Sequence, residues 1–594
     1  MTDLKLGSDF GNPSQDDWLV AVESALRGKA ADSLVSQDLA GFERQPLYTQ
    51  ATAPSETSGL PGFAPFTRGA QAVNNTYLPW HIAQRAVIGR KGVDNAALLT
   101  DLNGGVTALW LDFSQSVPDA GALKALLQDV RLDLAPLCLV PSAHGMAAVQ
   151  PVLDYYDQQE AAPETVGYLN LDPLAASLEQ GEMGEMGEMG KTATFDYAAL
   201  PSLSATRPGL RWMTSSGAAY HAHGASVPQE LGWMLAGLTD YMRELEAVGV
   251  SPAEALSKIT LTVAADVDFF ATLAKIRAAR LLFANIAEAV GVPDMPPQIH
   301  AESSLRAFAD IDPWVNILRA TAATMGAGIA GVDVMCVAPC TATSASDSTL
   351  TRRIARNTQI ILQEESHIGQ VTDAAGGSYY VEQLTHDLAT SAWEIFQDIE
   401  ATGGLSAAMA DGRIGDAIIQ QRAAFDAAMD TRAHAMVGVS EFPNLEEAPL
   451  EAASQSQYRL SHGFEALRNK AQKSKPKTFL ACLGDMASYT PRANFATNLY
   501  AAGGLHAILG DGGTDYDAIA QAFKKSNAKI AVICGSDADY EAHAPALAAA
   551  LKAAGVVHLA LAGKPRDLPE VDDYCFAGCQ ALSYLTNIHA KLGL

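Results

Sequence analysis

The sequence lacks any long hydrophobic run. None of the apolar stretches in its 594 residues approaches the roughly 18 residues that a membrane-spanning helix needs. Its first residues, Met1-Thr2-Asp3-Leu4-Lys5, also lack the basic segment and the apolar core of a secretory signal. We therefore expect a soluble cytoplasmic protein with no membrane partner.

Basic residues are scarce relative to acidic ones. The chain has 40 Lys and Arg against 67 Asp and Glu, which gives a formal net charge of −27. A chain without a basic surface does not attract polyanions, so nucleic acids and anionic membranes are excluded as partners. The acidic excess itself indicates mainly solubility.

Cysteine is also sparse, with seven residues scattered along the chain. Most of them lie inside apolar runs, which predicts buried, reduced thiols rather than a disulfide framework. Cys336 and Cys340 form one closely spaced pair, and Cys575 and Cys579 form another. No histidine spacing typical of a zinc site accompanies either pair, so we expect no metal site.

The residues that are present point to several α/β domains. A chain of 594 residues predicts two to four domains. Between residues 46 and 440, short apolar strands alternate with longer helical stretches, as in parallel sheets with crossover helices. The candidate strands are 106–111, 136–140, 166–170, 210–213, 259–263, 298–301, 332–337 and 369–372. Eight strands favour a (β/α)₈ barrel, although a doubly wound open sheet has the same periodicity.

Two segments stand apart from this pattern. Residues 1–45 contain one candidate amphipathic helix, because Trp18, Val22 and Leu26 recur at helical spacing after an acidic start. We predict that this extension contacts either a partner subunit or another domain of its own chain. A Gly-Glu-Met repeat at 181–189 predicts a surface loop.

The C-terminal part reads as a linker followed by a second domain. Residues 441–476 are polar and irregular, which predicts a linker. From 477 to 594 the βα alternation resumes with four to five strands, as in a flavodoxin-like sheet. After the first strand, at 479–484, we expect a loop and then a helix at 493–502. The other candidate strands are 529–534, 556–561 and 574–577.

Four motifs, in this order, resemble the methylmalonyl-CoA mutase family. They lie at 61–69 with Pro79-Trp80, at 275–282, at 353–366 and at 377–382, and the resemblance covers about residues 45–590. The resemblance implies a (β/α)₈ barrel that binds an acyl-CoA, joined to a flavodoxin-like domain that binds adenosylcobalamin. It also implies a radical rearrangement that interconverts methylmalonyl-CoA and succinyl-CoA.

The barrel motifs depart from the catalytic pattern of this family. Where catalytic members have a tyrosine two residues after an Arg-Gly pair, this sequence has Gln71. His221 matches the family histidine that bonds the thioester carbonyl, but the residues after it differ, so we predict a histidine satisfied by its neighbours. Glu365 matches an acid near the adenosyl group of the cofactor, and we expect it to be retained for packing or hydrogen bonding. These three are vestigial candidates rather than expected catalytic residues.

Two further stretches bear on the barrel. Residues 168–173, Tyr-Leu-Asn-Leu-Asp-Pro, replace the family's Thr-Ile-Gln-Asn-Asp strand motif and resemble its non-catalytic small subunits. Arg352, Arg353 and Arg356 are compatible with a phosphate patch, but ion pairs on a helix face are the favoured role.

The second domain lacks the residue that its family uses to hold cobalt. After the strand that ends near Gly484, catalytic members carry an Asp-x-His-x-x-Gly motif whose imidazole ligates cobalt, and here the histidine position falls at Ser488 or Tyr489. Two further cofactor loops are altered, at 535–538 and 562–565. Bulk or charge in such loops would block the close approach of the nucleotide tail. We expect no cofactor on this chain.

Together these departures favour the small (beta) subunit of a heterodimeric member of the family. The resemblance implies a homologous large (alpha) subunit as partner, which would bind the adenosylcobalamin. One alternative is a stand-alone CoA-binding or regulatory protein that retains the barrel fold without its catalytic activity. Another is an active mutase for a different acyl-CoA. The first alternative needs an open barrel, whereas Trp110, Leu111, Tyr168 and Trp212 suggest a filled bore.

Overall fold

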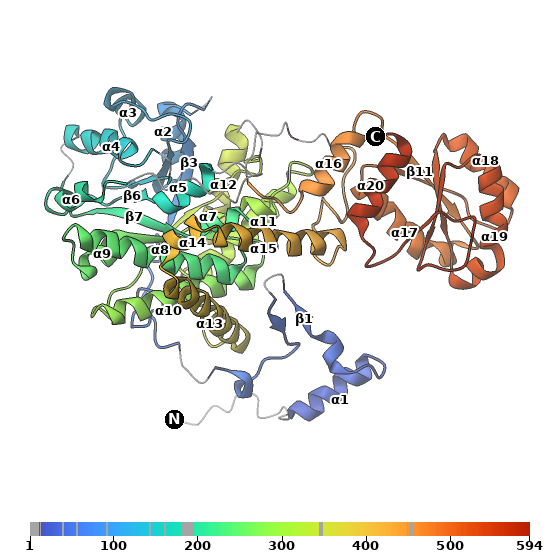
Figure 1. The fold of residues 1–594 in the computed structure, drawn as a ribbon, viewed down its shortest axis with the longest axis horizontal. Coiled ribbons are helices and arrows are strands. Elements are labelled where there is room, and N and C mark those ends of the chain that lie inside the picture. Colours follow the sequence, from blue (N-terminus) through green and yellow to red (C-terminus); the bar gives the residue numbers. More distant parts are fainter. Residues whose placement is uncertain are drawn as a thin grey trace.

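The computed structural model describes most of the 594-residue chain. The residues outside the description are 1–10, 12, 39–40, 55–57, 91–92, 142–143, 160–161, 181–194, 344–347, 448–449 and 451–456. The Gly-Glu-Met repeat at 181–189 therefore lies outside the described residues. Figure 1 shows a barrel unit, a smaller α/β unit beside it and an N-terminal segment that stands away from the barrel.

The predicted barrel is confirmed. Eight parallel strands close in the order β10-β3-β4-β5-β6-β7-β8-β9, and β10 pairs with β3 through Val334 and His81. Closure leaves no sheet edge and places alternate side chains inside the bore and under the surrounding helices. The strands are β3 (His81–Val87), β4 (Ala108–Asp112), β5 (Leu137–Leu139), β6 (Gly167–Leu171), β7 (Leu210–Ser216), β8 (Ile259–Ala265), β9 (Ile299–Ser303) and β10 (Val334–Cys336).

One of the eight expected strands is wrong. Residues 369–372 form turns, because His367, Gly369 and Asp373 all have positive φ, which an extended strand does not allow. The strand that completes the barrel is β3, which the sequence pattern did not reveal. Its central residues Gln84 and Arg85 are polar, so it lacks the apolar run of the other strands.

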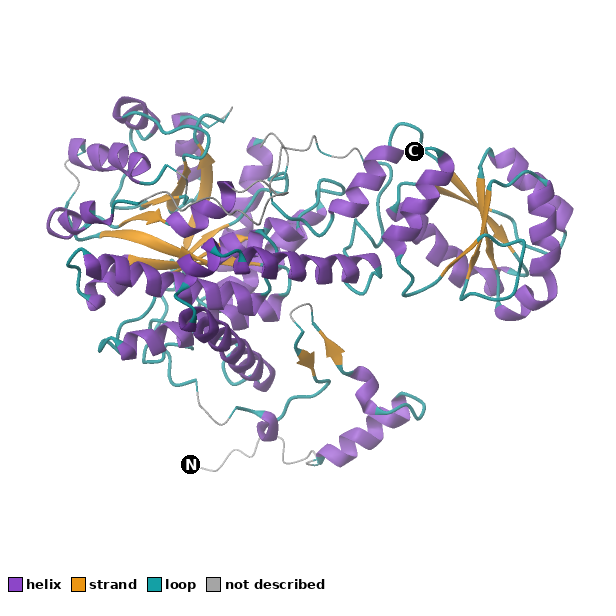
Figure 2. Ribbon diagram, viewed as in Figure 1, coloured by secondary structure: helices purple, strands orange, loops and turns teal. Residues whose placement is uncertain are grey.

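Helices surround the barrel, and several of them begin at a residue whose side chain caps the helix. The long helix α8 (Val227–Ala247), for example, starts at a Ser226 capping box with Pro228 in its first turn. The others are α2 (Asn95–Asn103), α3 (Ala120–Leu126), α4 (Met146–Gln158), α5 (Pro173–Gln180), α6 (Pro201–Thr206), α7 (Gly217–Ala222), α9 (Pro252–Lys258), α10 (Phe269–Ala289), α11 (Val315–Ile329), α12 (Thr349–Ile360), α13 (Tyr379–Ala401), α14 (Leu405–Ala410) and α15 (Arg413–Asp430). Figure 2 shows the strands enclosed by this helical layer.

The smaller unit has the predicted flavodoxin-like topology. Its parallel strands lie in the order β12-β11-β13-β14-β15, which is the 2-1-3-4-5 order of that fold. Helices α17 and α20 cover the face toward the barrel, and α18 and α19 cover the other face (Figure 1). The elements are β11 (Lys477–Cys482), α17 (Met486–Ala502), β12 (His506–Leu509), α18 (Tyr516–Ser526), β13 (Ile530–Cys534), α19 (Asp537–Ala553), β14 (His558–Ala562), β15 (Asp573–Cys575) and α20 (Ala581–Leu592).

The segment between the two units is not irregular throughout. It contains α16 (His462–Ala471), whose Phe464 and Leu467 are buried in a cluster shared with both units. Before this helix the chain crosses the barrel unit, where the Leu460 amide donates to the Arg306 carbonyl at 3.0 Å. The two units are therefore joined through a packed connection rather than through a polar tether.

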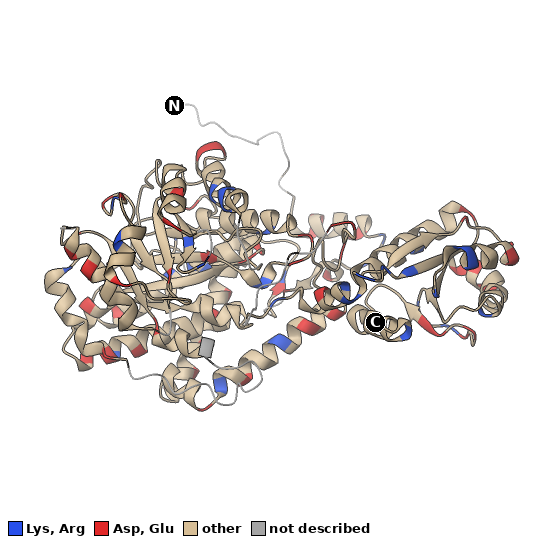
Figure 3. Cartoon of the chain, turned by 90° about the horizontal axis from the view of Figure 1, so that it is seen from above, with Lys and Arg blue, Asp and Glu red and all other residues tan. Residues whose placement is uncertain are grey.

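The predicted N-terminal helix exists as α1 (Gln15–Ala25), and none of its residues is buried. The hairpin that follows pairs β1 (Ser36–Gln37) with β2 (Glu43–Arg44) and reaches the barrel through an ion pair between Arg44 and Asp268 at 2.5 Å. Acidic side chains are spread over both units rather than gathered in one patch (Figure 3). Among the described residues, no helix is long and apolar enough to cross a membrane.

Candidate functional site

His221 is buried and both of its ring nitrogens have partners. The ring lies on α7, where Nδ1 is 3.1 Å from the Glu230 carboxylate and Nε2 is 2.7 Å from the Ser304 hydroxyl. Asp266 approaches Nε2 at 3.4 Å. The prediction of a histidine satisfied by its neighbours is therefore confirmed, and the ring has no nitrogen left to bond a substrate carbonyl.

Glu230 is the centre of this buried network. Its carboxylate accepts from the Lys275 ammonium at 2.7 Å and from the Ala264 amide at 2.9 Å, and both Glu230 and Lys275 are almost fully buried. Burial acts to raise the pKa of Glu230, but the charges of Lys275 and His221 outweigh it and lower the pKa to about 2. Glu230 is therefore ionised at neutral pH, and the motif residue Lys275 is bonded to it inside the barrel unit.

The other two barrel candidates do not join this network. Gln71 is exposed in the loop after Arg68, whose guanidinium bonds Asp373 at 2.7 Å. Glu365 is exposed at the end of a π-helical turn, η5 (Ile361–Glu365), so the expected packing role is wrong. The three vestigial candidates therefore do not form one closed site.

The motif at 168–173 holds neighbouring strands together. Asp172 caps α5 by accepting from the Ala175 amide at 2.9 Å, and it accepts from the Ser216 amide of β7 at 2.8 Å. Asn170 donates to the Leu139 carbonyl of β5 at 2.9 Å. Where catalytic members have polar strand residues, this chain has structural links among β5, β6 and β7.

Two of the three arginines of α12 form ion pairs, which is the role that the sequence favoured. Arg352 forms an ion pair with Asp101 of α2, and Arg356 reaches the same carboxylate at 3.2 Å. These pairs join two helices and are buried, whereas Arg353 is exposed. Two of the three guanidiniums are thus buried and share one carboxylate, which favours pairing between helices over a phosphate patch.

Aromatic side chains fill the middle of the barrel. Trp110 and Tyr168 point inward and cluster with Cys138, Val334 and other small residues. The buried His300 ring stands edge-on to Tyr168 at 4.4 Å between ring centroids. Leu111 and Trp212 instead pack under the helices, so only half of the expected bore residues face inward.

Sequence reasoning missed a charged cluster at the carboxyl end of the barrel. Arg85 of β3 bonds Asp112 of β4 at 2.7 Å and approaches Glu302 of β9 at 4.0 Å. Asp112 directly follows the strand predicted at 106–111, which was a signal, but β3 itself went unrecognised. With two acids facing one guanidinium, the cluster offers no free cation for a substrate carboxylate.

The second domain is closed at the position where the family that it resembles places the cobalt ligand. The expected loop at 485–492 is wrong, because α17 already begins at Met486 with Asp485 capping the Ser488 amide at 2.9 Å. Ser488 is therefore in the first turn of the helix, four residues after Gly484, which follows the end of β11. Tyr489 is buried, and a Cβ on Gly512 would come within 2.6 Å of its ring. Neither residue supplies the imidazole that cobalt ligation needs.

Tyr540 fills the space between the ends of β13 and β14. Its hydroxyl accepts from the Gly535 amide at 3.0 Å and donates to the Ala562 carbonyl at 2.8 Å. The guanidiniums of Arg492 and Arg566 lie over its ring at 4.6 and 5.0 Å. This is the sheet edge at which flavodoxin-like domains bind ligands. The residues present here do not fit a cobalamin nucleotide tail.

The N-terminus of α19 is closed as well. Ser536 and Asp539 form a capping box, and the Ser536 hydroxyl bonds the Asp539 carboxylate at 2.6 Å. Asp537 in the first turn accepts from Arg492 at 2.8 Å and from Arg566 at 2.6 Å. The altered loops at 535–538 and 562–565 are thus held by protein groups.

Among the described residues, no group of three or more His, Cys, Asp or Glu is placed to hold a metal ion. All seven cysteines are described, none forms a disulfide, and all but the half-buried Cys579 are buried, as the sequence predicted.

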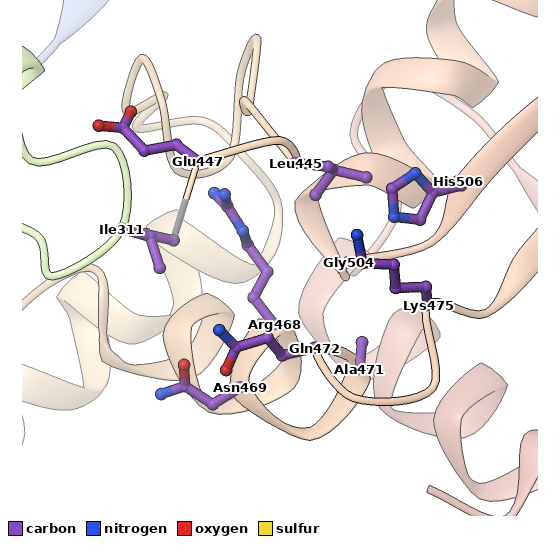
Figure 4. A pocket seen from close by; sticks show the side chains of 10 residues that line it. All are labelled: Ile311, Leu445, Glu447, Arg468, Asn469, Ala471, Gln472, Lys475, Gly504 and His506. Atoms are coloured by element: carbon purple, nitrogen blue, oxygen red, sulfur yellow. The ribbon is translucent and has the colours of Figure 1, made fainter. Parts of the chain in front are cut away.

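A basic pocket lies between α16 and the start of β12 (Figure 4). Arg468, Lys475 and His506 contribute to its lining. The Arg468 guanidinium is already bonded to the carbonyls of Gly438 at 2.9 Å and Asn444 at 2.7 Å. With a volume of ≈ 60 Å³, the pocket is far smaller than the roughly 300 Å³ that substrates require.

Comparisons with known proteins agree with the motifs. The family model described as methylmalonyl-CoA mutase matches residues 37–121 and 115–514. A methylmalonyl-CoA mutase small subunit of Streptomyces virginiae is 38% identical, with 100% of this chain and 98% of the relative covered. The small subunit of Propionibacterium freudenreichii subsp. shermanii is 32% identical, with 100% and 97% covered. A methylmalonyl-CoA mutase of Cereibacter sphaeroides is 28% identical, and the match covers 82% of this chain and 72% of that relative.

Proposed function

This chain belongs to the methylmalonyl-CoA mutase family, and we propose that it is the non-catalytic small subunit of an adenosylcobalamin-dependent enzyme. In this proposal a homologous large subunit interconverts methylmalonyl-CoA and succinyl-CoA. The observation that carries the proposal is the closed ligand edge of the second domain, where Tyr489 and Tyr540 are buried. Residues 46–440 are assigned as the mutase-type barrel, 441–476 as the linker and 477–594 as the degenerate cobalamin-binding-type domain.

The barrel supports the same conclusion. A CoA chain that threads a (β/α)₈ barrel needs small inward side chains, whereas Trp110 and Tyr168 occupy the bore. His221 is held by Glu230 and Ser304, so it is not available to polarise a thioester. These contacts also disfavour a stand-alone CoA-binding protein and an active mutase for another acyl-CoA.

The N-terminal extension supports a partner chain. Helix α1 carries Trp18, Leu19 and Val22, Leu26 follows directly after it, and all four side chains are only partly buried. Because exposed apolar surface in an isolated chain commonly marks an interaction site, we assign residues 1–45 to contact with the large subunit.

The proposal is tested with the chain alone, a large subunit alone and the co-expressed pair, each purified and assayed with methylmalonyl-CoA and adenosylcobalamin. We expect mutase turnover and cobalamin absorbance in the pair and neither in this chain alone. Calorimetry with an acyl-CoA on the isolated chain should give no saturable heat. Turnover or stoichiometric acyl-CoA binding by the isolated chain would instead support one of the two alternatives.

Restoring the missing histidine alone should not restore cofactor binding. In Ser488→His the imidazole stands on the first turn of α17, but Tyr540 still bonds the ends of β13 and β14. Equilibrium dialysis with cobalamin, followed by visible absorbance, should show no uptake by the variant or by the wild-type chain, with the large subunit as positive control. Stoichiometric uptake by Ser488→His would show that the histidine is the sole defect and that the Tyr540 contacts do not exclude the cofactor.

A further inference from the structure

The outer face of helix α11 is apolar although its side chains are exposed to solvent in the isolated chain. Trp314, directly before the helix, and Leu318 and Met325 within it are 49%, 68% and 36% exposed. Their spacings of four and seven residues place them on one helical face. The sole charged residue of α11 is Arg319, which is buried. In a chain with a net charge of −27, this surface helix presents no charged side chain to solvent.

The inner face of α11 has the reverse character, since small and polar residues line it. A Cβ on Gly326 would lie 3.0 Å from the Phe269 carbonyl oxygen, and one on Gly328 would lie 2.9 Å from the Trp80 ring. Asn316 bonds the Ala309 amide at 3.0 Å and carbonyl at 2.9 Å. These contacts fix the rotation of the helix, so its large apolar residues remain outside. A helix that is apolar on its outer face is normally buried on that face.

The apolar surface continues onto the loop beside the helix. Arg319 donates to the Val437 carbonyl at 2.6 Å, and the Val437 side chain is 52% exposed. A Cβ on the adjoining Gly438 would be 3.2 Å from Val315 of the helix, so the loop lies directly on α11. We call Trp314, Leu318, Met325 and Val437 the α11 strip.

A hollow lies next to the α11 strip. The loop turns back at a bridge between Val437 and Glu441, and the following Phe442 is exposed on the rim of a pocket of ≈ 370 Å³. Phe495 of α17 and Phe576 after β15 also line this pocket. The pocket is also lined by the Arg432–Glu441 ion pair and by Asn494 and Asn498. Protruding apolar side chains and a hollow of mixed polarity therefore occur on neighbouring parts of one surface.

We propose that the α11 strip is the surface on which this chain docks the corresponding surface of the homologous large subunit. This proposal rests on the proposed function and adds the location of the contact. Related chains that pair about a pseudo-two-fold axis bring the same surface of each chain together, and such a contact needs projections and hollows on one patch. The four side chains of the strip carry no charge, and the Glu447 carboxylate bonds Trp314 at one end of it. An uncharged patch with a polar rim fits the apolar surface of a partner subunit better than it fits a polyanion.

The test uses full-length chains. Leu318→Glu is compared with the wild type and with the matched control Leu509→Glu, whose leucine is 58% exposed on β12 of the other unit. Binding of each to the large subunit is measured by surface plasmon resonance. We expect Leu318→Glu to weaken the affinity at least about 30-fold, as for a central apolar contact, and Leu509→Glu to stay within about threefold of the wild type. Circular dichroism and melting of isolated Leu318→Glu should match the wild type, because Leu318 is exposed.

The outcomes separate the two proposals. If the wild-type chain does not bind the large subunit, the proposed function fails. If the wild type binds and Leu318→Glu binds equally well, the α11 strip is not the contact. If the isolated chain forms a dimer that Leu318→Glu disrupts, the strip binds a second copy and the assignment to the large subunit is overturned. Should Leu318→Glu misfold, hydrogen exchange of the wild-type pair decides, since unchanged protection of α11 on complex formation contradicts the proposal.

Discussion

Lys275→Met is expected to lower the free energy of unfolding by about 3–5 kcal/mol, because it leaves a buried carboxylate without its cation. Lys275 and Glu230 are almost completely buried and 2.7 Å apart. Methionine matches the length of lysine but supplies no charge, so Glu230 retains only His221 and the Ala264 amide as partners. Denaturant unfolding followed by circular dichroism measures the loss, and the transition of the barrel unit is the one to compare.

A double variant distinguishes lost charge from lost packing. Adding Glu230→Gln to Lys275→Met removes both charges, so most of the lost stability should return. The matched surface control is Asp133→Asn, which breaks an exposed pair with Arg131 and should hardly change the stability. If Lys275→Met costs no more than this control, the His221 ring rather than Lys275 neutralises Glu230.

The same pair gives stability a defined dependence on pH. The folded-state pKa of Glu230 is lowered from 4.5 to about 2, so its contribution is fully present above about pH 4.5. It is lost as the pH falls toward 2, since the unfolded chain then takes up a proton that the folded chain does not. The difference in stability between the wild type and Lys275→Met should therefore shrink over this range of pH.

The sequence predicted the fold where apolar runs coincide with strands and failed where polar residues replace them. Seven barrel strands were located, but β3 was missed because Gln84 and Arg85 interrupt its apolar pattern. Each has a structural partner, since Gln84 donates to the Arg352 carbonyl at 3.1 Å and Arg85 pairs with Asp112. Because these partners are distant in sequence, nothing near residues 84 and 85 indicates that the polar side chains are satisfied. A search for apolar periodicity therefore does not find a polar strand in a closed barrel.

The candidate site was predicted only in part, because its contacts also join residues that are distant in sequence. That His221 is satisfied by neighbours could be inferred from the altered residues after it, but Ser304 and Glu230 could not be identified as its partners. Tyr540 was missed altogether. Its role depends on the carbonyl of Ala562 in another loop, and a tyrosine in the first turns of a helix carries no signal for such a contact.

Trp110→Ala is the second substitution with a large expected effect. The indole is buried in the bore among small side chains, and its ring centroid lies 6.1 Å from that of His300. Removing a tryptophan from such a core costs about 3–5 kcal/mol through lost apolar contact and the cavity left behind. Thermal and denaturant unfolding followed by far-ultraviolet circular dichroism would measure the loss without relying on tryptophan fluorescence.

Trp314→Ala is the matched control, because it removes the same side chain from the α11 strip. In the isolated chain Trp314 is half exposed, so this change should alter stability by less than about 1 kcal/mol, whereas binding of the large subunit should weaken. Trp110→Ala should show the opposite pattern, with lower stability and unchanged affinity at temperatures where it remains folded. Equal effects of the two substitutions on stability would contradict a filled bore, and the barrel would then have room for a ligand. The two substitutions therefore separate the apolar residues that stabilise the barrel from inside from those that we propose contact the large subunit.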